Sequence, residues 1–168
     1  MKKILSVILV FCAVLNFACI ANANKMDSET NPIVVSNVVE TYEDGSYAVI
    51  TVSESISSSV RGTVKSGTKT TNYYSDNDTL LWRHIQHGTF DYTYGVSSVC
   101  TSASYSHTIY NDSWSLKSGK AWIDGNSSEG TATFVKKVLF VTTKTVNVAS
   151  NLRCDIYGNL SWNKLFSI

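Results

Sequence analysis

Proline, charge and cysteine are all scarce in this chain. One of its 168 residues is proline, only 16% are Asp, Glu, Lys or Arg, and two of its four cysteines fall in an N-terminal apolar stretch. A disordered chain would carry more charge and fewer apolar residues than the 43% found here, so the composition indicates a folded domain. Scarce proline together with abundant Ser, Thr, Val and Tyr favours β-strands.

Sequence motifs that carry chemistry are missing as well. The chain has no dense cluster of lysine and arginine for nucleic acid, no C-x-x-C pair for redox exchange and no G-x-S-x-G turn for a serine nucleophile. The acidic residues fall mostly in expected turns, and the Ser75–Asp78 loop lacks the spacing of an EF-hand. We therefore expect no catalytic residues, no cofactor, no metal and no nucleic-acid partner.

The N-terminus has the pattern of an export signal. Two lysines precede an almost unbroken apolar run, Ile4–Ile20, and the small residues after it predict cleavage between Ala23 and Asn24. The alternatives are lipid attachment at Cys19 and a retained membrane helix, although the run is slightly shorter than the roughly 20 residues of a span. With residues 1–23 removed, 12 basic and 13 acidic residues remain. We expect a secreted or cell-surface protein that meets a membrane only through this signal peptide, before cleavage.

Cysteine usage after cleavage is simple. Only Cys100 and Cys154 remain once the leader is removed, and a pair of cysteines in an exported protein predicts one disulfide bond. Two free thiols, or a bridge between two molecules, are the alternatives.

The rest of the chain reads as one β domain. Residues 24–33 are polar and predict a flexible arm, whereas residues 34–168 alternate strand-like stretches with turn signals such as Asp44-Gly45. The last long strands are expected over residues 131–141 and 142–155. No stretch has a convincing helical period, so we expect a single antiparallel β-sandwich with immunoglobulin-like layering, in a strand order that the pattern does not fix.

The strongest pattern is a hairpin over Leu80–Ile109. Side chains alternate between the two faces of a strand, and the even positions of the first strand and the odd positions of the second are the apolar ones. A two-residue type II′ turn at Gly95-Val96 brings these faces together. The resulting register gives the cross-strand pairs Trp82–Ile109, Gly88–Ala103, Tyr92–Val99 and Tyr94–Ser97.

Two kinds of side chain are candidates for a functional site. In this register His84 lies directly opposite His107, so two imidazoles could bind zinc if a third ligand were near, but no pattern supplies one. A partly buried polar pair is the simpler interpretation. Trp114 and Trp122 belong to a set of aromatic residues larger than a small core needs. Core packing accounts for most of the set, and exposed members could stack on sugars or form a contact patch.

One segment resembles a known family. Thr41–Ser53, which reads TYEDGSYAVITVS, is similar to an E-T-x-E-D-G-S-Y opening that follows the signal peptide in small secreted β proteins of Gram-positive, clostridial-type bacteria. Those proteins also share a Trp strand, G-T-F-x-Y, a cysteine, S-A-S-Y-S, another Trp and a final cysteine before G-N-L-S. The matching positions here are Trp82, Gly88–Phe90 with Tyr92, Cys100, Ser102–Ser106, Trp114, Cys154 and Gly158–Ser161. The resemblance implies export and a shared β domain, and this uncharacterised family brings no catalytic residues.

These features predict a secreted, non-catalytic protein. A module that binds cell-wall glycan or a surface protein is the first hypothesis, because export and surplus aromatic residues fit it. A small secreted toxin or bacteriocin-like protein is the alternative, since the size of the chain permits it.

Overall fold

The computed structural model describes residues 32–59 and 62–167, so the predicted signal peptide and nearly all of the predicted arm lie outside the described residues. Within these ranges the chain forms nine strands, and nothing helical there is long and apolar enough to span a bilayer. The strands are β1 (Ile33–Thr41), β2 (Tyr47–Ser59), β3 (Gly62–Tyr74), β4 (Leu80–Thr93), β5 (Ser97–Ile109), β6 (Trp114–Asp124), β7 (Ser127–Val138), β8 (Val141–Cys154) and β9 (Leu160–Ser167).

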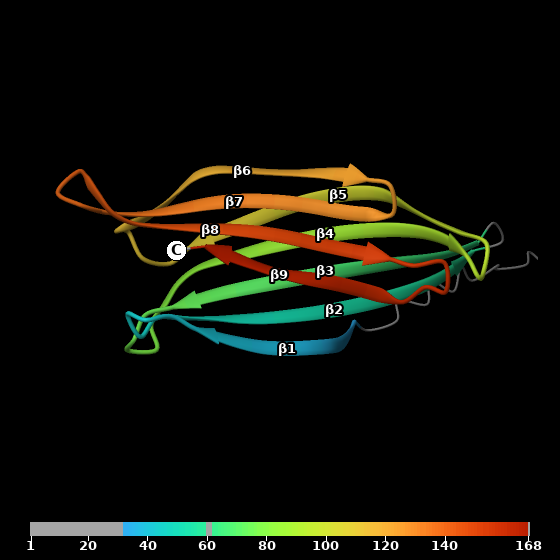
Figure 1. Ribbon diagram of the computed structural model, residues 1–168, viewed down its shortest axis with the longest axis horizontal. Helices are drawn as coiled ribbons and strands as arrows, with labels where there is room; N and C mark the ends of the chain where they lie inside the picture. The colour runs from blue at the N-terminus through green and yellow to red at the C-terminus, as the bar shows by residue number, and fades with distance from the viewer. Residues whose placement is uncertain (1–31, 60–61, 168) are drawn as a thin grey trace, which may run out of the picture.

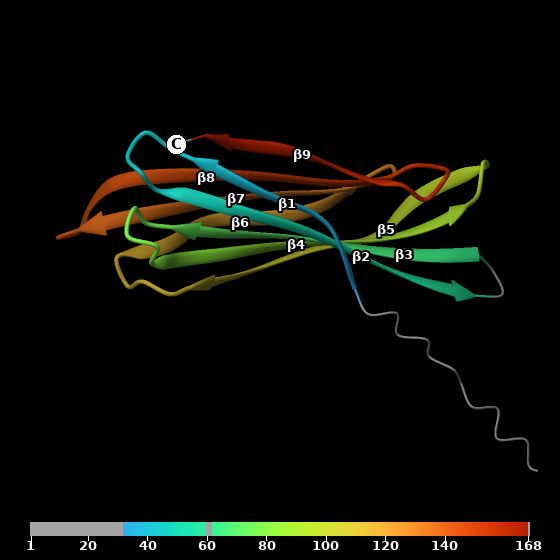
Figure 2. The same ribbon diagram turned by 90° about the horizontal axis from the view of Figure 1, so that it is seen from below.

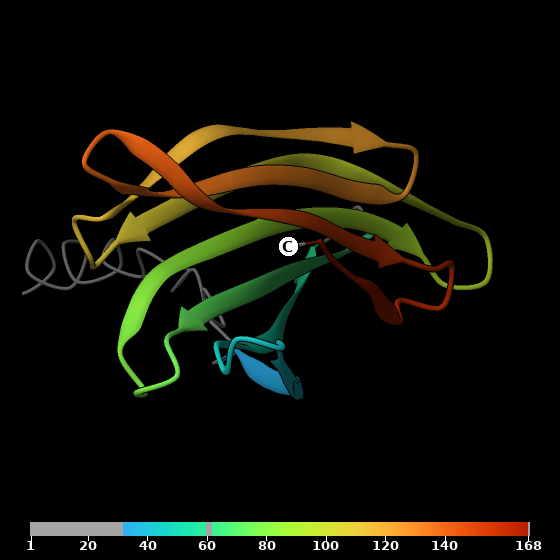
Figure 3. The ribbon, with the colours of Figure 1, turned by 60° about the vertical axis from the view of Figure 1, so that its left-hand side comes forward.

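The strands form two antiparallel sheets that pack face to face (Figure 1, Figure 3). β1 to β5 make one sheet and β6 to β9 make the other, each in sequence order. Every connection within a sheet is therefore a hairpin, and the β5–β6 connection takes the chain from one layer to the other. β4 and β5 lie against β7 and β8. The predicted β-sandwich is confirmed, and its connections form two simple meanders.

The sandwich has two ends, which we name after the turns of sheet β6–β9. The β7–β8 end also holds the β1–β2, β3–β4 and β5–β6 turns, and the β8–β9 end also holds the β4–β5 and β6–β7 turns. One apolar cluster lies toward each end. The cluster toward the β7–β8 end centres on stacked rings, with Trp82 4.8 Å from Tyr73 and 4.0 Å from Phe134 between ring centroids. The smaller cluster toward the β8–β9 end consists of Val52, Phe90, Cys100, Leu152 and Cys154.

The central hairpin predicted from the alternating pattern is confirmed as β4–β5. Its register is right from the Trp82–Ile109 pair to the Thr89–Ser102 pair, and the even-numbered side chains of β4 face the core as expected. Slipping by one residue would send that whole set of side chains to solvent, and the buried aromatic rings therefore fix the register over most of the hairpin.

The far end of the hairpin differs from the prediction because of a β-bulge. Thr101 is an extra residue on β5, so Cys100 rather than Thr101 lies opposite Phe90. The bulge reverses the alternation beyond it: Cys100 is buried and Val99 is 49% exposed, and the predicted pairing of Tyr92 with Val99 is wrong.

The turn that closes this hairpin also differs from the prediction. Thr93 pairs with Ser97, the amide of Val96 donates to the carbonyl of Thr93, and Gly95 has a φ of +70°. Glycine therefore occupies the second central position of the turn, and the expected type II′ turn with a Tyr94–Ser97 pair is wrong. A bulge shifts a strand by one residue, and this shift moved the turn as well.

Candidate functional site

The two histidines predicted to face each other do so, but in different environments. His84 pairs with His107 across β4 and β5, yet His84 is fully buried and His107 is exposed. Burial holds the pKa of His84 down at about 4, and the neighbouring charges of Lys69 and His107 act in the same direction. No group of three His, Cys, Asp or Glu side chains in the described ranges lies close enough to hold a metal ion.

His84 belongs to a belt of buried polar side chains between the two apolar clusters. Lys69 and Gln86 are fully buried beside it; Lys69 Nζ donates to the Asn163 carbonyl at 2.7 Å, and desolvation lowers the pKa of Lys69 to about 8. Gln86 Nε2 donates to Ser128 Oγ at 2.8 Å. This belt was not predicted from the alternating pattern, although polar residues at every second position of β4 were a signal for it. Its members are Lys69, Thr71, His84, Gln86, Ser128 and Ser150.

The belt does not form a catalytic constellation. A serine nucleophile needs a base within hydrogen-bond reach, yet both ring nitrogens of His84 lack a hydrogen-bond partner among the described residues. The belt is closely packed where it meets the other sheet, because a Cβ on Gly130 would lie 2.0 Å from Gln86 Oε1. Gln86 thus joins the two sheets through its hydrogen bond to Ser128 and its close contact with Gly130.

The two cysteines lie in one buried cluster, on opposite sheets. The amide of Cys100 donates to the Gly125 carbonyl at 3.0 Å, and the amide of Cys154 donates to the next carbonyl, Asn126, at 3.1 Å. Both are free thiols in this structure, and burial raises the pKa of each. The predicted disulfide is not formed here and stays a prediction, which the shared cluster and the adjacent carbonyls support.

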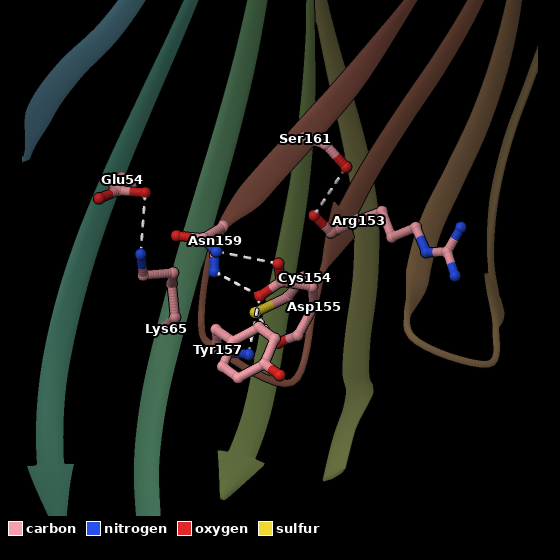
Figure 4. A network of polar contacts seen from close by, with 8 residues as sticks. All are labelled: Glu54, Lys65, Arg153, Cys154, Asp155, Tyr157, Asn159 and Ser161. Carbon is pink, nitrogen blue, oxygen red and sulfur yellow. Dashed lines mark hydrogen bonds and ion pairs between the residues drawn. The ribbon is translucent and has the colours of Figure 1, made fainter. Parts of the chain in front are cut away.

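Polar contacts beside Cys154 form a self-contained turn (Figure 4). The Asp155 carboxylate accepts hydrogen bonds from the amides of Tyr157 and Asn159, both at 2.8 Å, and from the Asn159 side chain. These bonds, the Asn159 side chain first, lower the pKa of Asp155. Glu54 and Lys65 form an ion pair at 3.0 Å in the same view. The Asp155 bonds are internal to the β8–β9 turn and the Glu54–Lys65 pair joins β2 to β3, so these polar contacts are explained by the fold.

Several of the surplus aromatic residues are core, and few are exposed. Trp114 is 4% exposed and packs edge-on to Tyr73, so it is a core residue and not a member of a contact platform. Trp122 is 38% exposed, with Lys120 Nζ 4.6 Å from its ring centroid. Tyr94 and Tyr157 form an exposed T-shaped pair at the β8–β9 end.

The most exposed large apolar side chains among the described residues are at the β7–β8 turn, which the sequence analysis did not identify. Phe140 is 100% exposed and Leu139 is 88% exposed, and Val138 and Val141, which pair beside them, are also exposed. We call Val138–Val141 the hairpin tip. Fully burying such a side chain is worth about 1.5–3 kcal/mol, and the fold leaves four of them in a row in water.

The backbone of the hairpin tip does not suit its residues. Leu139 and Phe140 have φ values of +48° and +72°, as both central residues of a two-residue type I′ turn do. Side chains with a Cβ disfavour this conformation by about 1–2 kcal/mol per residue, and Asn-Gly is the usual sequence. In the other described turns, positive φ falls on four glycines and on Asp78. Folding alone therefore does not account for a Leu-Phe pair here.

Three lysines surround the hairpin tip. Lys136 and Lys137 precede it with exposed side chains, and successive strand residues point to opposite faces, so each face of the hairpin carries one cation. Lys144 lies opposite Lys136 on β8 but is engaged within the fold, since its Nζ bonds the Asp44 carboxylate and, at 2.7 Å, the Tyr73 hydroxyl. The hydrogen bond from Lys144 holds the pKa of Asp44 at about 2.

Comparison with models of protein families, with curated proteins and with solved structures finds no match to this chain. Its function must be inferred from its own side chains, and among these the hairpin tip is the feature that the fold explains least.

Proposed function

We propose that this protein is an exported, non-catalytic binding module that contacts its target through the hairpin tip. The observation that carries the proposal is the run of exposed apolar residues Val138–Val141 on a turn that disfavours its two central residues. Exposed apolar surface and a disfavoured backbone both lower stability, so their combination at one place supports a role outside folding.

Export is supported by the sequence. The apolar run after two lysines, the small residues before Asn24 and the similarity of Thr41–Ser53 to secreted clostridial proteins agree with one another. The target would then be on a cell surface, and cell-wall glycan, a surface protein and lipid are the candidate classes. Trp122 offers a second, smaller apolar contact for a glycan.

Retention on cells tests this function. The protein and a variant with Leu139→Asn and Phe140→Gly are incubated with intact Gram-positive cells and with purified cell wall, and the bound fraction is measured. The Asn-Gly pair suits a type I′ turn, so the variant removes the apolar side chains without disturbing the hairpin. We expect the unchanged protein to be retained and the variant to be lost.

A matched control lies at the opposite end of the sandwich. Tyr94 and Val96 are 75% and 73% exposed at the β4–β5 turn, so changing both to Ser removes a comparable apolar surface. This control should be retained like the unchanged protein. Equal retention of all three proteins, or retention of none, would refute binding through the hairpin tip.

A small secreted toxin is the second candidate, because an apolar tip next to lysines also suits a protein that attacks membranes. Growth inhibition of neighbouring strains by the purified protein, lost in the same double variant, would favour it over the binding module.

A further inference from the structure

The hairpin tip has the geometry of a shallow membrane anchor. Figures 1 and 2 show the β7–β8 turn reaching further along the long axis of the molecule than the β1–β2, β3–β4 and β5–β6 turns at the same end. A flat surface approaching this end would therefore meet Leu139 and Phe140 first.

Resting on the function proposed above, we propose that the target of the hairpin tip is the surface of an anionic lipid bilayer. Val138–Val141 enters the boundary between headgroups and acyl chains, and Lys136 and Lys137 lie at the level of the lipid phosphates.

The length of the hairpin tip fits that boundary. A strand rises about 3.4 Å per residue, so Leu139 and Phe140 extend about 7 Å beyond Lys137. Apolar surfaces of peripheral membrane proteins enter the headgroup and acyl boundary by about 5–10 Å. The apolar side chains would thus leave water while the lysine side chains stay among the headgroups.

The backbone of the hairpin tip also suits a lipid environment. Polar backbone groups without partners are costly in hydrocarbon. Val138 pairs with Val141, so the chain reverses over only Leu139 and Phe140, the shortest common hairpin loop. This turn leaves few backbone groups unpaired, and those remain at the shallow depth where headgroups and water are available.

Charge favours an anionic surface over a neutral one. Lys136 and Lys137 are exposed on opposite faces of the hairpin, and a lysine near an anionic bilayer strengthens binding by about fivefold. Of the acidic residues at this end, Glu40 lies near the end of β1, the others lie in turns that are set back from the hairpin tip (Figure 1), and Asp44 is already bonded to Lys144. Those turns contain Glu43, Asp44, Asp76, Asp78 and Asp112.

The chemistry of the hairpin tip fits lipid better than glycan. Sugar recognition combines an aromatic face with hydrogen-bonding groups, whereas Val138, Leu139, Phe140 and Val141 carry no side-chain donor or acceptor. The protruding turn, its purely apolar side chains and the flanking lysines therefore favour insertion into a lipid bilayer over binding to a glycan.

Co-sedimentation with lipid vesicles tests the inference. The purified protein is mixed with vesicles of phosphatidylcholine containing phosphatidylglycerol, and in parallel with vesicles of phosphatidylcholine alone. We expect clear binding to the anionic vesicles, weaker binding to the neutral ones, and a decrease in binding as salt is added.

Matched variants identify the surface that binds. The Leu139→Asn/Phe140→Gly protein should bind anionic vesicles at least about tenfold more weakly, because two large apolar side chains no longer enter the bilayer. Lys136→Gln/Lys137→Gln should remove most of the preference for anionic lipid. The Tyr94→Ser/Val96→Ser control should bind like the unchanged protein. All four proteins are purified after export, without the predicted signal peptide, so that the apolar run Ile4–Ile20 does not itself bind the vesicles.

The outcomes separate this inference from the proposed function. If the unchanged protein binds no vesicles, or the hairpin-tip variant binds them equally well, the lipid inference is wrong. If that variant nevertheless loses retention on cells or purified wall, the proposed function survives with a protein or glycan as the target. Loss of vesicle binding in the hairpin-tip variant alone supports both.

Discussion

The two ends of strand β7 make opposite use of a two-residue turn. At its start, Gly125 takes the positive φ of the turn, and the carbonyls of Gly125 and Asn126 accept hydrogen bonds from the amides of two buried cysteines. At its end, Leu139 and Phe140 take positive φ values with their side chains in water. At the first turn a glycine takes the positive φ and the backbone carbonyls are bonded to the core. At the second turn two side chains with a Cβ take positive φ values, and these side chains are exposed to solvent. Such local conflicts in a folded chain are expected at functional sites.

The largest effect predicted separates two phenylalanines near the two ends of the sandwich. Phe90 is fully buried in the cluster that contains both cysteines, whereas Phe140 is fully exposed. Phe90→Ala should lower the free energy of unfolding by about 3–5 kcal/mol, and Phe140→Ala should change it by less than about 0.5 kcal/mol. Urea unfolding of both variants checks this, and similar losses at the two positions would remove the distinction between the ends.

The cysteine pair gives the next largest effect. A Cys100–Cys154 bond would link the two sheets beside the Gly125-Asn126 turn, and we expect oxidised protein to be more stable than reduced protein by about 2–4 kcal/mol. Thermal unfolding before and after reduction, with free thiols counted in each sample, checks this. Two thiols per chain in exported protein, with no change on reduction, would leave the cysteines as core residues only.

Acid should lower the free energy of unfolding because of His84, which is buried between the two apolar clusters. His84 has a folded pKa of about 4, below the value of about 6.5 of an unfolded histidine, so below pH 6.5 the unfolded chain gains a proton that the folded chain does not. Stability should therefore fall between pH 6.5 and pH 4, by up to about 3 kcal/mol. His84→Gln should reduce this slope in unfolding measured against pH.

The fold was largely predictable because an alternating pattern reports directly on which side of a strand is buried. Trp82, Phe90 and the even positions between them gave the correct face of β4 and most of its register. The pattern failed at Thr101, since one extra residue reverses the alternation beyond it. The division of the aromatic residues into core and surface, Trp114 among them, was not predictable, because the sequence does not state which rings the opposite sheet will cover.

The candidate site was not predicted. Strands were expected over residues 131–141 and 142–155, whereas the chain turns at Leu139 and Phe140. A turn normally reveals itself through glycine, asparagine or aspartate, and none stands here. Two adjacent lysines followed by four apolar residues were the available signal, and they have meaning only once the structure places them at an exposed turn.

Stability of the Leu139→Asn/Phe140→Gly protein tests most directly the claim that the hairpin tip is not maintained for the fold. Asn-Gly suits the positive φ values of both positions, so the free energy of unfolding should stay the same or rise by about 1–2 kcal/mol. A fall of more than about 1 kcal/mol would mean that Leu139 and Phe140 stabilise the sandwich, and would contradict their assignment as a contact surface.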